Sequence, residues 1–89
     1  SLNAPTTKRI EIGRDVIPKG ASVVVVDDTL ATGETLVAVL QLLGKAGIPA
    51  TNISILVIAE FPIHRGRNFL RQNGFGGVNI QSLLVYGTA

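Results

Sequence analysis

The fold is decided by one stretch of the 89-residue chain, Val23-Val24-Val25-Val26-Asp27-Asp28-Thr29-Leu30-Ala31-Thr32-Gly33-Glu34-Thr35-Leu36. Four β-branched apolar residues in a row predict a strand that is buried on both faces. Two adjacent carboxylates follow, then a short hydroxyl-rich loop with one glycine, then an apolar segment of helical character. This order brings acidic side chains and a set of backbone N–H groups to the carboxyl end of a strand. It predicts a site for a sugar phosphate.

The loop after the strand has the composition of a phosphate-binding loop. The first N–H groups of a helix have no partner inside the helix, and the helix dipole favours an anion there. Gly33 permits close approach of the backbone, and the hydroxyl groups of Thr32 and Thr35 can donate to phosphate oxygens. Ionised Asp27 and Asp28 can accept hydrogen bonds from the paired hydroxyls of a ribose, or bind a magnesium ion. The predicted ligand therefore carries a phosphate at one end and a diol in its middle.

Four other interpretations of this loop can be compared with its residues. A P-loop requires lysine where Glu34 stands, which disfavours a nucleoside triphosphatase, and the dinucleotide fingerprint G-x-G-x-x-G is absent. A flavin-mononucleotide loop also places threonines around one glycine after a strand, but the preceding acid pair has no role in it. In the remaining interpretation Asp28 or Thr32 only caps the helix, because Asp and Thr are common N-cap residues.

Residues 27–35 resemble the phosphoribosyl-pyrophosphate motif of type I phosphoribosyltransferases. Within that family they are most similar to the adenine phosphoribosyltransferases, whose motif runs Val-Val-Val-Val-Asp-Asp-x-Leu-Ala-Thr-Gly-Gly-Thr. Weaker similarities continue outside the motif, so that the resemblance extends from about residue 8 to residue 86. These weaker matches lie at residues 10–12, 18–20, 42–44, 60, 65–67 and 82–86.

The resemblance implies an activity and a role for each matching residue. Members of the family transfer a phosphoribosyl group from phosphoribosyl pyrophosphate to a nitrogenous base and release pyrophosphate, with Mg²⁺ that arrives with the substrate. By this resemblance Asp27 and Asp28 are catalytic: they hold the ribose hydroxyls and stabilise the electron-poor ribosyl centre of the transition state. The residues implied to cradle the 5-phosphate are Ala31, Thr32, Gly33, Glu34 and Thr35.

The resemblance also bears on the base. Hypoxanthine-type relatives have an acid–base aspartate where this chain has Ala31, so the alanine favours an adenine-like purine. Glu60 matches an acidic position of adenine enzymes, where it either borders the base site or caps the next segment, and Phe61 is the candidate for the apolar residue that packs on the base. One departure is Glu34, where adenine enzymes usually have glycine; its side chain can point outward while its N–H serves the phosphate.

Length and composition predict one small domain, residues 1–89, that forms part of a larger unit. Complete members of the family are considerably longer, and their amino-terminal half, with its pyrophosphate loop, has no counterpart here; nor does the segment before Ile10 match their mobile loop. Hydrophobic residues make up 46% of the sequence and charged residues only 16%, which is apolar for a small domain. In the predicted helix, polar residues fall only at positions 34, 35, 41 and 45. Positions 34, 38, 41 and 45 form one narrow stripe at helical spacing and almost everything else is apolar, so a second flank requires cover. We expect a homo-oligomer or a missing amino-terminal half to supply it.

Strand and helix signals alternate along the chain. Strands are expected over residues 8–13, 22–27, 52–59 and 79–85, and helices over residues 34–46 and 66–73. Gly47 and Gly74 are expected to end the two helices. Right-handed crossovers then give an α/β fold, a parallel sheet with flanking helices, which is a partial type I phosphoribosyltransferase (Rossmann-like) fold. Ligands bind at the carboxyl ends of such strands, where Asp28 lies.

The remaining charged residues predict no second site. Arg65, Arg67 and Arg71 are interpreted as a solvated helix face, because the net charge is only +2 and no aromatic platform accompanies them, so no nucleic-acid partner is expected. His64 is the single histidine and cysteine is absent, which leaves a metal site or a Ser-His-Asp triad without support. No run reaches the ~20 apolar residues that span a bilayer. We expect no membrane partner and a cytoplasmic location.

Three functions stay open at this point. The first is an adenine-type phosphoribosyltransferase, represented by its phosphoribosyl-pyrophosphate-binding half. The second is a non-catalytic domain that senses phosphoribosyl pyrophosphate or serves as a partner domain. The third is a flavodoxin-like mononucleotide binder.

Overall fold

The computed structural model describes residues 20–87. Its elements are β1 (Val23–Leu30), α1 (Glu34–Lys45), β2 (Ile53–Glu60), α2 (Gly66–Gln72) and β3 (Asn79–Val85), with the short 3-10 helices η1 (Ala50–Asn52) and η2 (Pro62–His64). The strand expected over residues 8–13 lies outside the described residues. The other predicted strands and helices are confirmed, although their ends shift by a few residues.

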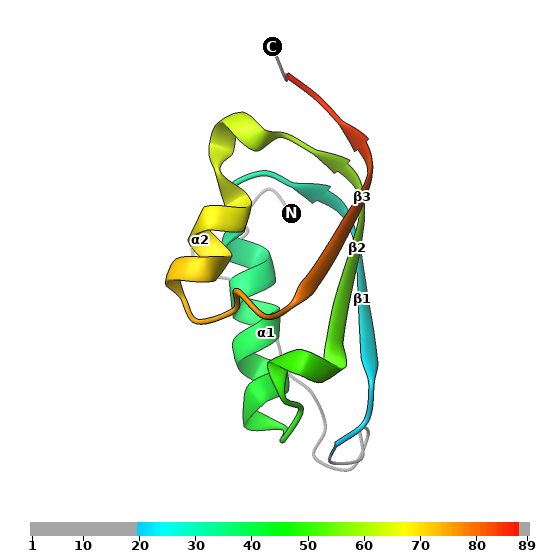
Figure 1. Cartoon of the computed structure of the whole chain (residues 1–89), viewed down its shortest axis with the longest axis vertical. Helices are drawn as coiled ribbons and strands as arrows, with labels where there is room; N and C mark the ends of the chain where they lie inside the picture. The colour runs from blue at the N-terminus through cyan, green and yellow to red at the C-terminus, as the bar shows by residue number, and fades with distance from the viewer. Residues whose placement is uncertain (1–19, 88–89) are drawn as a thin grey trace, which may run out of the picture.

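The three strands form one parallel sheet in the order β1-β2-β3. Each crossover contains a helix, and α1 and α2 lie side by side on the same face of the sheet (Figure 1). The predicted α/β architecture is thus confirmed, with both flanking helices on one side. The register pairs Val25 with Ile55 and Ile55 with Ile80, which brings the carboxyl ends of the strands to one edge.

The hydrophobic core lies between the sheet and the two helices. Apolar side chains recur along α1 at the three- and four-residue spacing that places them on one face of a helix. The fully or nearly fully buried apolar residues are Leu30, Leu36, Val37, Leu40, Leu43, Ile48, Ile53, Ile55, Val57, Leu70 and Val78. This core fixes the position of α1 under the carboxyl end of β1.

The opposite face of the sheet is apolar and exposed. Val24 and Val26 in β1 are 65% and 68% exposed, and Leu83 in β3 is 66% exposed. Since side chains alternate across a strand, every second residue of the valine run necessarily points away from the helices. Most of the exposed large apolar residues therefore lie on the sheet, whereas Val39 and Leu42 on α1 are half-buried. The expectation that a partner covers a flank of α1 stays a prediction.

β1 is longer than expected and changes its side-chain alternation near its end. The strand continues through the acid pair to Leu30, because its pairing with β2 extends to Thr29–Ala59 and Leu30–Glu60. In β1, more buried and more exposed side chains alternate up to Asp28, and beyond it the alternation is shifted by one residue. The same shift occurs in β2 at the residues that pair with this part of β1. As a result Leu30 and Glu60 are buried, and the chain turns toward the helices beyond these ends (Figure 1).

Candidate functional site

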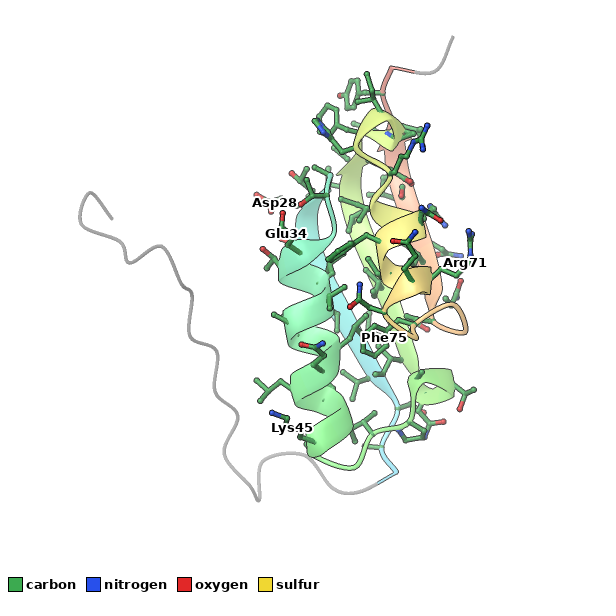
Figure 2. All side chains as sticks on the ribbon, turned by 90° about the vertical axis from the view of Figure 1, so that its left-hand side faces the viewer. Asp28, Glu34, Lys45, Arg71 and Phe75 are labelled. Atoms are coloured by element: carbon green, nitrogen blue, oxygen red, sulfur yellow. The ribbon has the colours of Figure 1, made fainter. Side chains whose placement is uncertain are left out.

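A hollow of about 260 Å³ lies at the carboxyl end of β1. Its wall contains every residue expected to bind ribose 5-phosphate: Asp27, Asp28, Ala31, Thr32, Gly33, Glu34 and Thr35. Figure 2 shows Asp28 and Glu34 at the same end of α1, with Lys45 at the far end of that helix. The structure thus brings the residues of the predicted phosphate and ribose sites together, while their roles stay a prediction.

The loop between β1 and α1 is built around a left-handed glycine. Gly33 is the N-cap of α1 and has φ 86° and ψ 0°, a conformation that side chains other than glycine rarely adopt. No side chain of the N-cap residue caps the helix. The nearest substitute is Thr32 Oγ1, which accepts from the N–H of Glu34 at 3.5 Å, the outer limit of a hydrogen bond. The interpretation of Asp28 or Thr32 as a simple helix cap therefore finds little support.

The backbone donors at the start of α1 are largely unengaged. The first bond of the helix joins the N–H of Val37 to the carbonyl of Gly33 at 2.9 Å. Within residues 20–87, the N–H groups of Thr32, Gly33, Thr35 and Leu36 have no hydrogen-bond acceptor. These donors sit at the positive end of the helix dipole, where an anion is stabilised.

The two aspartates approach the hollow from neighbouring positions on β1. Asp27 is half-buried, and Asp28 is exposed. The backbone N–H of Asp28 donates to Oδ1 of Asp27 at 2.8 Å, which ties that carboxylate to its own strand. Both residues line the hollow, and so do the residues at the start of α1.

A second acid at this sheet edge, Glu60, has a different environment. Arg67 donates from Nε to Glu60 Oε2 at 2.8 Å and from Nη2 to Oε1 at 3.0 Å, and Ser82 Oγ donates to Oε1 at 2.6 Å. The Glu60 side chain is only 8% exposed, that of Arg67 44%. The hydrogen bond from Arg67 is the largest influence on the pKa of Glu60 and lowers it, with help from Ser82 and against the effect of burial. The same hydrogen bond raises the pKa of Arg67.

This ion pair changes the interpretation of two residues. Arg65, Arg67 and Arg71 are all exposed as expected, but Arg67, the second residue of α2, also reaches the sheet and binds Glu60. Glu60 does not cap the next segment, since both of its carboxylate oxygens bind Arg67 or Ser82. Its place beside the base site stays a prediction.

Phe61 stacks on a residue that the sequence did not single out for the site, Tyr86. Their ring centroids are 5.3 Å apart and the ring planes differ by 15°. The N–H of Phe61 donates to the carbonyl of Leu30 at 2.9 Å, and the N–H of Tyr86 donates to the carbonyl of Glu60 at 2.8 Å. Tyr86 could have been found from sequence, because it directly follows β3 as Phe61 follows β2. Neither Glu60 nor Phe61 lines the hollow at β1.

Two kinds of feature are absent from the part of the chain that the structure describes. Residues 20–87 contain no group of three or more His, Cys, Asp and Glu side chains that could hold a metal ion. Neither α1 nor α2 has the length and apolar character that a bilayer crossing requires, and no other helix in these residues does.

Comparison with known proteins agrees with this geometry. The family model for the phosphoribosyl transferase domain matches residues 5–68. The chain is 41% identical over 78 residues to the adenine phosphoribosyltransferase of Methanococcus vannielii, and 34% identical over 80 residues to that of Thermotoga maritima. These alignments cover 88% and 90% of the chain but only 41% and 42% of the relatives. The chain therefore spans about two fifths of the length of the proteins it matches.

Two solved structures of adenine phosphoribosyltransferases also match this chain. The APRTase from Giardia lamblia complexed with 9-deazaadenine matches with a TM-score of 0.73 at 29% identity. The adenine phosphoribosyltransferase from Thermoanaerobacter pseudethanolicus matches with a TM-score of 0.69 at 34% identity. Each match covers 84% of this chain and 40% of the other. The three-stranded sheet and its helices correspond to one part of the fold of those enzymes.

Proposed function

The chain belongs to the phosphoribosyl transferase domain family, and on this basis we propose that it is the half of a phosphoribosyltransferase that binds phosphoribosyl pyrophosphate. In the complete protein it transfers the phosphoribosyl group to an adenine-like purine, a reaction of purine salvage. The observation that carries the proposal is the hollow at the end of β1, which Asp27, Asp28 and the residues at the amino terminus of α1 line together.

The phosphate end of the ligand lies on the loop of residues 31–35. The unengaged N–H groups of Gly33, Thr35 and Leu36 supply donors to a monoester dianion, and the dipole of α1 adds a favourable field. The exposed hydroxyl groups of Thr32 and Thr35 supply two further donors. Glu34 is exposed on the polar stripe of α1, so solvent screens much of its repulsion from the phosphate.

The ribose lies against the acid pair. The carboxylates of Asp27 and Asp28 accept hydrogen bonds from the ribose hydroxyls, and their negative charge stabilises the ribosyl centre as it becomes electron-poor. Two carboxylates also suit Mg²⁺, which commonly binds proteins through one or two carboxylates and otherwise keeps waters and substrate oxygens. When bound with the substrate, Mg²⁺ neutralises charge on the pyrophosphate leaving group.

The base lies beyond the ribose, toward the end of β2. Phe61 offers an aromatic face on which a planar purine can pack, and its stacking on Tyr86 limits the orientations of the ring. Ala31 brings no acidic side chain to this edge, which fits a base that needs no proton from that position.

The rest of the complete protein, or a second subunit, covers the open face of the sheet. Parallel sheets are normally buried on both faces, and Val24, Val26 and Leu83 are more than half exposed. Their burial would add a stabilisation of roughly 25 cal/mol for each Å² removed from water.

The test is a titration of the 89-residue chain with ribose 5-phosphate and with phosphoribosyl pyrophosphate plus Mg²⁺, followed by an assay for adenine-dependent release of pyrophosphate. We expect saturable binding of both ligands. Binding without pyrophosphate release would mean that this domain binds the ligand and that turnover requires the complete protein. Binding of flavin mononucleotide in preference to both ligands would contradict the proposal.

A further inference from the structure

The phosphate loop rests against the first turn of α2. A Cβ atom added to Gly66 would overlap the carbonyl oxygen of Ala31 and lie 2.7 Å from Leu30 Cδ1. A Cβ atom added to Gly33 would lie 2.7 Å from Leu70 Cδ1 and 3.0 Å from the carbonyl oxygen of Gly66. Two glycines, one in the loop and one at the start of α2, therefore allow the two backbones to touch. The contact between residue 66 and the loop was not among the predictions from sequence.

The first turn of α2 is held in place from the sheet. Arg67, next to Gly66, is bound by the carboxylate of Glu60 at the end of β2, and Ser82 on β3 binds the same carboxylate. α2 has only seven residues, too few to be stable by itself. The position of Gly66 against the loop is thus set by the ion pair and by the burial of Leu70.

We propose that Gly66 is a positioning residue for the phosphate site. The carbonyl of Ala31 and the N–H of Thr32 belong to one planar peptide unit, so a displacement of that carbonyl necessarily turns this N–H. The missing side chain at Gly66 leaves room for the carbonyl, and the backbone of α2 supports it from behind. In this way α2, which does not line the hollow, sets the direction of a donor at its rim. The inference rests on the proposed function, since it assigns Gly66 to phosphate binding.

The direct test compares Gly66→Ala with Gly77→Ala, with ribose 5-phosphate as the ligand. Gly77 is the matched control, because a Cβ atom there would meet nothing within 4 Å and its φ is not positive. Loss or distortion of a hydrogen bond to a charged group should raise the Kd of Gly66→Ala by roughly ten- to a hundredfold. The Kd of Gly77→Ala should stay within about twofold of the parent value.

A residue-resolved measurement separates positioning from general destabilisation. In ¹H–¹⁵N spectra, ribose 5-phosphate should shift the N–H signals of residues 32–36 in the parent and in Gly77→Ala, and should shift them much less in Gly66→Ala. The signals of core residues such as Ile48 and Val57 should keep their parent positions in Gly66→Ala. If Gly66→Ala binds as tightly as the parent, the inference is wrong and the proposed function stands. If the parent does not bind ribose 5-phosphate, both fail.

Hydrogen exchange of the parent chain tests the inference without any variant and so covers the case in which Gly66→Ala does not fold. Ribose 5-phosphate should slow the exchange of N–H groups in α2, at residues 68–70, together with those of the loop, because the two segments are in contact. Slower exchange in the loop alone would overturn the inference.

Discussion

The chain contains two strand–loop–helix units whose acidic residues, at the same position in the fold, have different surroundings. β1 and β2 are parallel and their ends are paired at Leu30 and Glu60. After β1, the aspartates face a hollow and the donors of the helix start are unengaged. After β2, the acid is buried and bound by Arg67 and Ser82. An acidic residue at the end of a parallel strand is therefore not a sufficient sign of a binding site; the partners that surround it decide its role.

Removing the negative charges of Asp27 and Asp28 should have the largest effect on ligand binding. The double variant Asp27→Asn and Asp28→Asn should bind phosphoribosyl pyrophosphate with Mg²⁺ at least about a hundredfold more weakly, since each lost charged hydrogen bond is worth roughly 1.5–3 kcal/mol. Calorimetric titration measures the loss, and circular dichroism should show an unchanged fold. Binding equal to that of the parent would mean that the aspartates do not hold the ligand.

The corresponding change in the second unit should act on stability instead. Glu60→Ala leaves Arg67 without its partner and should lower the free energy of unfolding by about 1–3 kcal/mol, the cost of unpairing a partly buried charged group. The single variant Asp28→Asn should change that free energy by less than about 0.5 kcal/mol, because its side chain is exposed. Urea denaturation checks both. Equal effects of the two variants on the free energy of unfolding would contradict the claim that Glu60, but not Asp28, stabilises the fold.

The second unit should also give the fold a defined acid sensitivity. The bond from Arg67 lowers the pKa of Glu60 in the folded chain, so the unfolded chain binds more protons between the two pKa values. The stabilisation is complete above the unfolded value of about 4.3 and is lost as the pH falls through the lower folded value. The stability difference between the parent and Glu60→Gln should therefore be constant near neutral pH and shrink in acid. A difference that grows in acid would contradict this sign.

The smallest expected effect concerns the departure at Glu34. Glu34→Gln removes a negative charge beside the phosphate loop and should tighten ribose 5-phosphate binding by about two- to fivefold at low salt, the equivalent of roughly 0.3–1 kcal/mol. High salt should reduce the gain, because the side chain is exposed and its charge is screened. Titrations at two salt concentrations measure it. Weaker binding by this variant would indicate that the carboxylate itself contacts the ligand.

Local sequence predicted the first unit well and the second unit poorly. The stretch from Val23 to Leu36 carries its own strand, loop and helix signals, and the residues that line the hollow are neighbours in sequence. The partners of Glu60 come from α2 and β3, so their approach depends on the register of the whole sheet. Arg67 looked like a solvated residue because helical spacing cannot show which charged side chain reaches a strand. β3, in contrast, begins and ends as predicted.

The other incorrect predictions from sequence have the same physical origin. The end of β1 was placed before the loop because Asp is uncommon in strands, but pairing with β2 carries the strand to Leu30. The exposed apolar surface on the sheet face opposite the helices was not predicted, since the composition of α1 indicated only a flank of that helix. The contact of Gly66 with the loop depends on two backbones that are far apart in sequence.

The most direct test of the central claim is a ¹H–¹⁵N titration of the 89-residue chain with ribose 5-phosphate. If the loop holds the phosphate and the aspartates hold the ribose, the signals of residues 27–28 and 32–36 should shift together with a single Kd, while those of Phe61, Ile63 and His64 should not move. Shifts confined to the second unit, or no shift in residues 32–36 at saturating ligand, would contradict the account.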